Sequence, residues 1–161
     1  IEGLALAAFE RTRISSMDPL LKDIFYLVIR DEARHVTFGV NYLEDFVSTL
    51  SEEERHDRAE FAYEACVVMR DRFTSTNVMN HYGWDFNEAI EFVNQSEGSH
   101  IFLNLLFSKI MPNLKRIGLL TEAVSEKYEK MGILEFQDLE DDGQTSWEEL
   151  SKPLEYNSKT A

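Results

Sequence analysis

Cysteine is nearly absent from this chain of 161 residues, and its single cysteine, Cys66, cannot form an intrachain disulfide. A disulfide-stapled secreted scaffold is therefore excluded, and a reducing compartment, the cytoplasm, is the expected location. Cys66 falls within a helical pattern, so we expect it to be a small core residue. Only 7 glycines and 3 prolines are present, which leaves room for long uninterrupted helices.

Positive charge is also scarce. The 16 lysines and arginines stand against 30 aspartates and glutamates, which gives a formal net charge of −14. This excess of negative charge argues against nucleic acid and against an anionic membrane as partners. No stretch approaches 18 consecutive apolar residues, and no signal peptide is visible, so we expect neither a membrane span nor secretion.

The residues that are present suit a globular helical domain. Hydrophobic residues make up 43% of the chain and aromatic residues 12%. The chain opens at Ile1 already in helical spacing and without an N-cap, so we expect it to begin inside a helix, as a fragment would. We expect a helical bundle domain over residues 1–133 and an acidic tail over residues 134–161, which either lies on a neighbouring surface or is mobile.

Capping signals divide the chain into helices. Asp18 and Pro19 are an N-cap and a first helical residue, Ser51 opens a capping box, Asp85 caps a short helix, and Gly132 ends the last helix. The expected helices cover residues 2–13, 19–50, 52–73, 85–95, 96–115 and 121–131, with Pro112 kinking or ending the fifth near Met111. Residues 74–84 are expected to form an irregular connector.

The longest expected helix carries a carboxylate and an imidazole one turn apart, Glu32 and His35. A buried, unpaired carboxylate costs several kcal/mol. Burial of the helix face that carries Glu32 and His35 therefore requires a compensating metal or arginine. Glu-x-x-His facing into a helical bundle is how di-iron and di-manganese carboxylate proteins bind metal. The alternative is that Glu32 pairs with an arginine and His35 is a satisfied core histidine. Spacing places both on one face with Phe25, Val28, Gly39, Tyr42 and Phe46, and we expect that face to be buried.

Two other positions have the right residue types for ligands. Glu2 shares the stripe of the first helix with apolar neighbours, so it is a second candidate carboxylate. Glu97 and His100 repeat the Glu-x-x-His spacing, but they fall on the polar side of their helix, opposite its apolar stripe. We therefore expect Glu97 and His100 not to be metal ligands.

The run Arg30-Asp31-Glu32-Ala33-Arg34-His35 resembles the Arg-Asp-Glu-x-x-His signature of the ribonucleotide reductase small subunit. It resembles still more closely the bacterial ferritin-like domain proteins of the di-iron oxygenase kind. In those proteins a Glu-Gly-Leu-Ala-Leu helix precedes an Asp-Glu-Ala-Arg-His-Val helix, as residues 2–6 and 31–36 do here. Residues 112–120 also look like the downstream part of such proteins. The resemblance implies an all-α, ferritin-like or ribonucleotide-reductase-like antiparallel helical bundle, of which this chain matches the C-terminal half.

By this resemblance Glu2, Glu32 and His35 are metal ligands. Asp31 would orient an imidazole, and Arg30 or Arg34 would neutralise nearby carboxylates. The implied cofactor is a dinuclear iron centre, with manganese as the alternative, because oxygen-rich ligation with one imidazole per metal suits these metals better than zinc. The family uses six ligands from two helix pairs, and no residues here match the first pair. The other half-site is then upstream sequence, a second copy of the chain, or absent.

A complete site of this kind implies an O2-dependent oxidoreductase acting on a small organic substrate. Two other functions stay open: a non-enzymatic, ferritin-like metal-binding protein, and a helical dimerisation module with a degenerate site. An apolar pocket beside Glu32 would favour the first function, exposed carboxylates leading to the site the second, and an arginine in the metal position the third. Without the first helix pair, the face of Glu2, Glu32 and His35 has no intrachain cover, so we expect a homodimer.

Overall fold

The computed structural model describes residues 2–74, 76–144, 146 and 148, and their side chains except those of residues 2, 73, 74, 76, 77, 80, 89, 93 and 94. Over this part of the chain the fold is all-helical, with no strand, which confirms the expected fold class at that level. The elements are α1 (Glu2–Ser15), α2 (Pro19–Ser48), α3 (Glu52–Thr74), α4 (Thr76–Tyr82), α5 (Phe86–Gln95), α6 (Glu97–Arg116), α7 (Glu122–Lys130), and the short 3₁₀ helices η1 (Leu134–Asp138) and η2 (Asp142–Gln144).

Short-range capping chemistry fixes most of these boundaries. The Asp18 carboxylate accepts hydrogen bonds from the backbone N–H groups of Leu20 (2.9 Å) and Leu21, and Pro19 follows as the first helical residue. Ser51 and Glu54 form the expected capping box: the Glu54 carboxylate accepts from the Ser51 N–H at 2.9 Å. Gly132 adopts a positive φ of 73° directly after the α7 C-cap. These predicted helix ends are therefore confirmed.

One local prediction was wrong. Residues 74–84 are not an irregular connector, because α4 spans Thr76–Tyr82. The helix around Pro112 continues to Arg116, close to its predicted end at residue 115, so of the two alternatives at Pro112 an end near Met111 is excluded. Pro112 is buried there, so tertiary packing holds the helix through a residue that cannot donate a backbone hydrogen bond.

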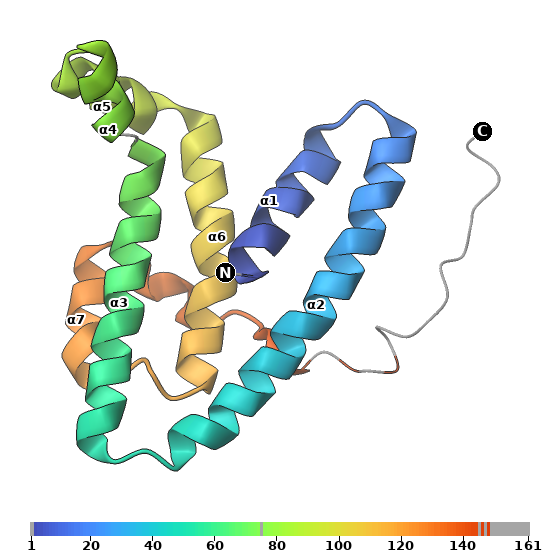
Figure 1. Ribbon diagram of the computed structural model, residues 1–161, viewed down its shortest axis with the longest axis vertical. Coiled ribbons are helices and arrows are strands. Elements are labelled where there is room, and N and C mark those ends of the chain that lie inside the picture. The colour runs from blue at the N-terminus through green and yellow to red at the C-terminus, as the bar shows by residue number, and fades with distance from the viewer. Residues whose placement is uncertain (1, 75, 145, 147, 149–161) are drawn as a thin grey trace.

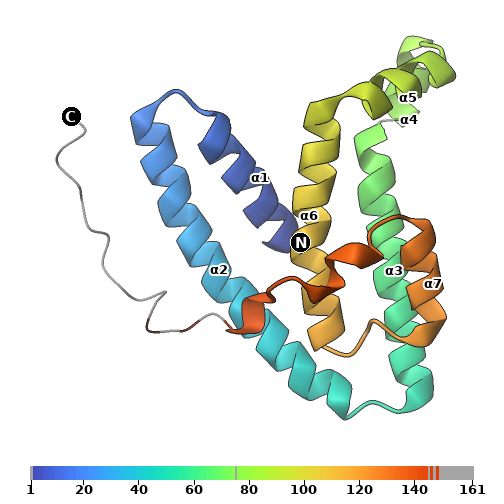
Figure 2. The ribbon, with the colours of Figure 1, turned by 180° about the vertical axis from the view of Figure 1, so that it is seen from behind.

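The helices form one hairpin, α1 with α2, and α6 lies between that hairpin and α3. α1 and α2 run antiparallel, as predicted, and Phe9 contacts Phe25 with ring centroids 5.5 Å apart. α6 packs against α1, and α7 lies beside α3, with α4 and α5 at the far end of α3 and α6 (Figure 1). Figure 2 shows the segment after α7 passing across α6 to reach α2. We call this segment, residues 134–144, the strap.

The core lies around α6, between the α1–α2 hairpin on one side and α3 with α7 on the other. Leu106, Phe107 and Met111 of α6 are at most 1% exposed, and they form one apolar cluster with residues of α1, α2, α3 and α7. Cys66 is 2% exposed and belongs to this cluster, which confirms its predicted core position. α6 is therefore the central helix of the molecule, and α1 joins it through the Arg11 guanidinium, which donates to the Gly98 carbonyl at 2.9 Å.

The buried face of α2 is not the predicted one. Val36, Thr37, Val40 and Val47 are its buried residues. Tyr42 and Phe46, expected in the core, are 61% and 47% exposed. The helix has apolar residues on two opposite sides, and α6 packs against the side that carries the small, branched residues.

Candidate metal centre

Glu32 and His35 lie side by side on α2, one helical turn apart. The His35 Nδ1 atom is 3.2 Å from the Glu32 Oε2 atom, within hydrogen-bond distance. The Glu32 side chain is 25% exposed and the His35 side chain 64% exposed, so the imidazole is open to solvent. The pair therefore presents one carboxylate and one imidazole together, on a surface rather than in the core.

The three charged residues beside this pair are also on α2. The Arg34 guanidinium donates to the Asp31 carboxylate at 3.0 Å. The Asp31 side chain is 71% exposed and the Arg34 side chain 35% exposed. Asp31 thus has an arginine as its hydrogen-bond partner, in place of the imidazole that the resemblance assigns to it. Arg30 is half-buried on the same helix.

Glu2 begins α1, but its side chain lies outside the described residues. The predicted meeting of the Glu2 and Glu32 carboxylates is therefore a prediction that the structure does not test. Glu97 and His100 stand at the start of α6, and both are exposed. The two Glu-x-x-His pairs are thus on different helices, and neither is enclosed by the core.

No group of three or more histidine, cysteine, aspartate or glutamate side chains comes together as a metal site among the described residues. The donor set of Glu32 and His35 nevertheless fits half of a dinuclear carboxylate site: one carboxylate and one imidazole per metal, with the third expected ligand at Glu2. The His35 side chain, 64% exposed, lies toward an open side of α2.

That open side of α2 is apolar. Six large hydrophobic side chains are exposed along it: Leu20 (67%), Ile24 (46%), Leu27 (46%), Phe38 (64%), Tyr42 (61%) and Phe46 (47%). At 100° per residue these six fall on one face, which also carries Asp31 and His35. We call this face the outer strip. The described elements that pack on α2 are α1, η2 and α6, and they lie on its remaining sides (Figures 1 and 2).

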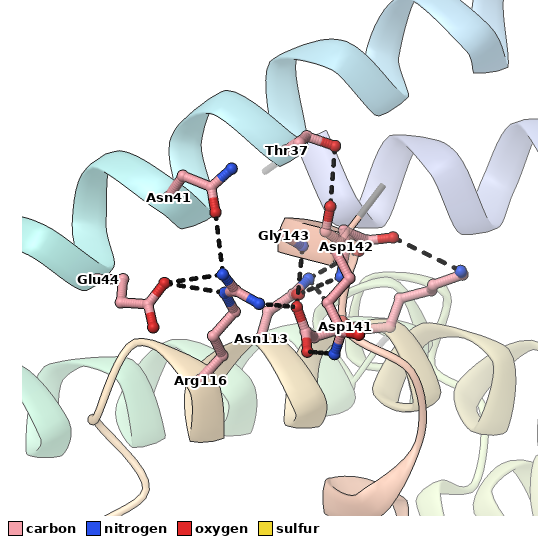
Figure 3. Close-up of polar contacts among 10 residues, drawn as sticks. Thr37, Asn41, Glu44, Asn113, Arg116, Asp141, Asp142 and Gly143 are labelled. Carbon is pink, nitrogen blue, oxygen red and sulfur yellow. Dashed lines mark hydrogen bonds and ion pairs between the residues drawn. The ribbon is translucent and has the colours of Figure 1, made fainter. Parts of the chain in front are cut away.

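On its inner side α2 is held by the strap. Thr37, only 1% exposed, donates from its hydroxyl to the Asp142 carbonyl at 2.9 Å and to the Ala33 carbonyl at 2.8 Å. Asn113 of α6 donates to the Asp142 carboxylate at 2.8 Å and accepts from the Asp142 N–H at 2.9 Å. The strap therefore bridges α2 and α6 (Figure 3).

Arg116 is the centre of this polar cluster. Its guanidinium donates to the carboxylates of Glu44 on α2 and Asp141 on the strap, each at 3.0 Å, and to the Asn41 side chain at 3.3 Å (Figure 3). Burial by itself would raise the pKa of Asp141. Hydrogen bonds from Gln144 and Arg116, the charge of Arg116 and the Gly143 N–H outweigh burial and hold the pKa of this carboxyl below its usual value.

Sequence reasoning missed this cluster. Asp141 and Asp142 were assigned to an acidic tail, where a run of carboxylates gives no sign of a specific partner. The partners lie far away in the chain: Thr37 is 105 residues from Asp142, and Asn41 is 75 residues from Arg116. One local feature of the sequence could have indicated the cluster. Asn113 and Arg116 are polar residues on α6, and their neighbours Pro112 and Leu114 are buried.

Comparisons with protein-family models, curated proteins and solved structures give no match. The site therefore rests on its own residues and on the resemblance of the motif. Within the described residues, no helix combines the length and apolar character that crossing a bilayer demands.

Proposed function

We propose that this chain is a ferritin-like di-iron carboxylate domain of an O2-dependent oxidoreductase, and that it supplies half of the dinuclear metal site. The observation that supports this proposal most directly is the contact between Glu32 and His35, 3.2 Å apart on a long helix, with the His35 side chain 64% exposed. An imidazole and a carboxylate at this spacing are suited to share a metal with ligands from another element.

In this proposal Glu32, His35 and Glu2 hold the metal, iron or in its place manganese. When bound, a pair of Fe(II) ions would supply electrons to reduce O2, and the activated oxygen would oxidise a small organic substrate. The residues of this chain bind and orient the metal. Glu32 brings negative charge and His35 a neutral nitrogen donor. The apolar side chains of the outer strip exclude water from the site once a partner covers them. A reducing compartment, such as the cytoplasm, suits a site that is loaded with Fe(II).

The remaining ligands belong, in this proposal, to a second copy of the chain. No third histidine, cysteine, aspartate or glutamate joins the pair among the described residues, so in this proposal the further carboxylates come from outside the described part of this fold. A homodimer supplies them without any other partner, because a two-fold axis duplicates the same carboxylate and imidazole on the facing surface.

Metal content of the purified protein tests the proposal. After anaerobic loading with Fe(II) and removal of free metal, we expect iron to remain bound to the wild-type chain. Both E32A and H35A should lose most of that iron, because each removes one of the donor groups. The iron-loaded wild-type protein should consume O2, measured with an oxygen electrode, and the two variants should not.

The second Glu-x-x-His pair provides a matched control. E97A and H100A change the same residue types at the same spacing on α6, and they should keep the wild-type iron content. If the wild-type chain retains no iron, or if E97A and H100A lose as much iron as E32A and H35A, the proposed half-site is wrong.

A second candidate function is favoured by the outer strip itself. Six exposed large side chains along one helix are the kind of surface that mediates association. In that case the chain is a helical dimerisation module, and Glu32 and His35 are the remains of a metal site. An iron-free protein that self-associates through α2 would support this second function.

A further inference from the structure

The outer strip has a different chemical character at its two ends. Its N-terminal half consists of the aliphatic residues Leu20, Ile24 and Leu27, and its C-terminal half of the aromatic residues Phe38, Tyr42 and Phe46. The midpoint between the first and last of these residues is residue 33. The strip spans about 39 Å at 1.5 Å per residue, which is most of the length of α2.

Four polar residues at the centre of α2 are also arranged about residue 33. Asp31 and Glu32 come directly before Ala33, and Arg34 and His35 directly after it. Of these, Asp31 and His35 lie in the middle of the outer strip, and their side chains are 71% and 64% exposed. A carboxylate and an imidazole thus lie at equal distances on either side of the midpoint.

An antiparallel pairing of two such helices satisfies both patterns at once. With a two-fold axis at the level of Ala33, each residue faces the position that lies equally far on the other side of residue 33. Ile24 then faces Tyr42 of the second copy, so aliphatic side chains pack on aromatic ones. Asp31 faces the imidazole of His35 in the second copy, and a ring N–H of that imidazole can donate a hydrogen bond to the Asp31 carboxylate. A parallel pairing would bring Asp31 against Asp31, at a cost in repulsion.

We infer that the outer strip of α2 is an antiparallel homodimer interface whose two-fold axis passes at the level of Ala33. The same axis brings the two Glu32 and the two His35 side chains to one edge of the helix pair, where two half-sites meet. This shared metal site rests on the proposed function, whereas the interface itself rests only on the exposed side chains and their order. A stable dimer needs about 800 Å² of buried surface on each copy, so the contact has to extend along the whole strip.

Two complementary substitutions test the antiparallel register. I24K places an ammonium against Tyr42 of the second copy, and Y42E places a carboxylate against Ile24. By sedimentation at micromolar concentration we expect the wild-type chain to be a dimer and each variant alone to associate at least ten-fold more weakly. An equimolar mixture of I24K and Y42E should recover dimers, because the two introduced charges face each other. In a parallel pairing the introduced charges never meet, and the mixture would stay monomeric.

Both substituted positions are solvent-exposed, so the variants should retain the wild-type helix content in circular dichroism. F61E is the matched control: Phe61 of α3 is 69% exposed but lies outside the outer strip, and this variant should dimerise as the wild type does. The inference is overturned by a monomeric wild type, by a mixture of I24K and Y42E that stays monomeric, or by dissociation of F61E.

Metal analysis separates this inference from the proposed function. A wild-type dimer that binds no iron leaves the interface standing and removes the shared site. If a monomeric wild-type chain binds iron, that result supports the metal site and overturns the interface.

Discussion

At the scale of single residues, Gly143 shows how tightly the strap packs. A Cβ atom at this position would lie 2.8 Å from the Cζ atom of Arg116 and still closer to its Nε atom. Arg116 cannot move away freely, because Glu44, Asn41 and Asp141 all bind its guanidinium. The strap therefore has room for glycine and for no larger residue at this point.

We expect G143A to lower the free energy of unfolding by about 1 to 3 kcal/mol, because the added methyl displaces Arg116 from its partners. Urea unfolding followed by circular dichroism measures this change. Gly39 is the control, since a Cβ there meets nothing within 4 Å in the interior of α2. G39A should stabilise the protein by about 0.5 to 1 kcal/mol through its higher helix propensity. A G143A variant as stable as the wild type would contradict the packing at Arg116.

Cys66 gives a second prediction at this scale. Burial raises the pKa of its thiol to about 11, and the neighbouring Tyr128 hydroxyl offsets this rise only in part. At pH 8 the thiolate is therefore rare and enclosed, and we expect a thiol-specific reagent such as Ellman's reagent to react at least a hundred-fold more slowly with the native protein than with the urea-unfolded chain. Fast labelling of the native protein would mean that the core around α3 and α7 opens readily.

At the scale of elements, the strap determines how α2 is held against α6. The Asp141 side chain is 13% exposed and pairs with Arg116, whereas Asp138, on the same segment, pairs with Lys115 and is 74% exposed. The two aspartates thus make the same kind of ion pair at different depths, which makes them a matched pair for mutation.

At pH 7 we expect D141N to cost about 2 kcal/mol and D138N less than about 0.5 kcal/mol, because buried charge-assisted hydrogen bonds contribute more than exposed ion pairs. The pKa of Asp141 is lower in the folded than in the unfolded state, so its contribution is complete above about pH 5 and is lost as the pH falls through the lowered folded value. Denaturant midpoints at pH 7 and pH 3 measure this, and the D141N difference should shrink at pH 3. Equal costs for D141N and D138N would show that burial at the strap is unimportant.

The elements also show what the sequence can and cannot determine. Helix ends at Asp18, Ser51 and Gly132 were predictable because each depends on a side chain or a φ angle within a few residues. The buried face of α2 was not predictable, because both of its sides are apolar and only the position of α6 selects between them. For the candidate site, the pairing of Glu32 with His35 followed from their spacing, but the exposure of His35 depends on what lies across from α2 in space.

At the scale of the whole molecule, the two ends of α3 and α6 differ in packing. Near α7 the core is closed, with Val124 and Tyr128 fully buried. At the other end α4 and α5 leave Tyr82, Trp84 and Phe92 at least 60% exposed. The end of the molecule at α7 is therefore well packed, whereas the end at α4 and α5 is loosely packed.

Hydrogen exchange should reveal this gradient. We expect the slowest amides in α6 between Leu106 and Leu114, which require global unfolding to exchange, and protection factors at least a hundred-fold lower in α4 and α5, which can open locally. Mass spectrometry of peptic fragments measures both regions in one experiment. Equal protection in α4, α5 and α6 would contradict the difference in packing.

The strap also has a consequence for the order in which the protein can fold during synthesis. Thr37 lies in α2, but the carbonyl that its hydroxyl contacts belongs to Asp142, 105 residues later. Closing so long a loop is slow. The helix α6 lies between these two segments in the sequence and binds the strap, so it has to be in place first. The α1–α2 hairpin therefore leaves the ribosome before the strap does, and the polar side chains on its inner side are still hydrated at that time. This inner surface has to avoid contacts with other proteins until the strap has been synthesised and binds it.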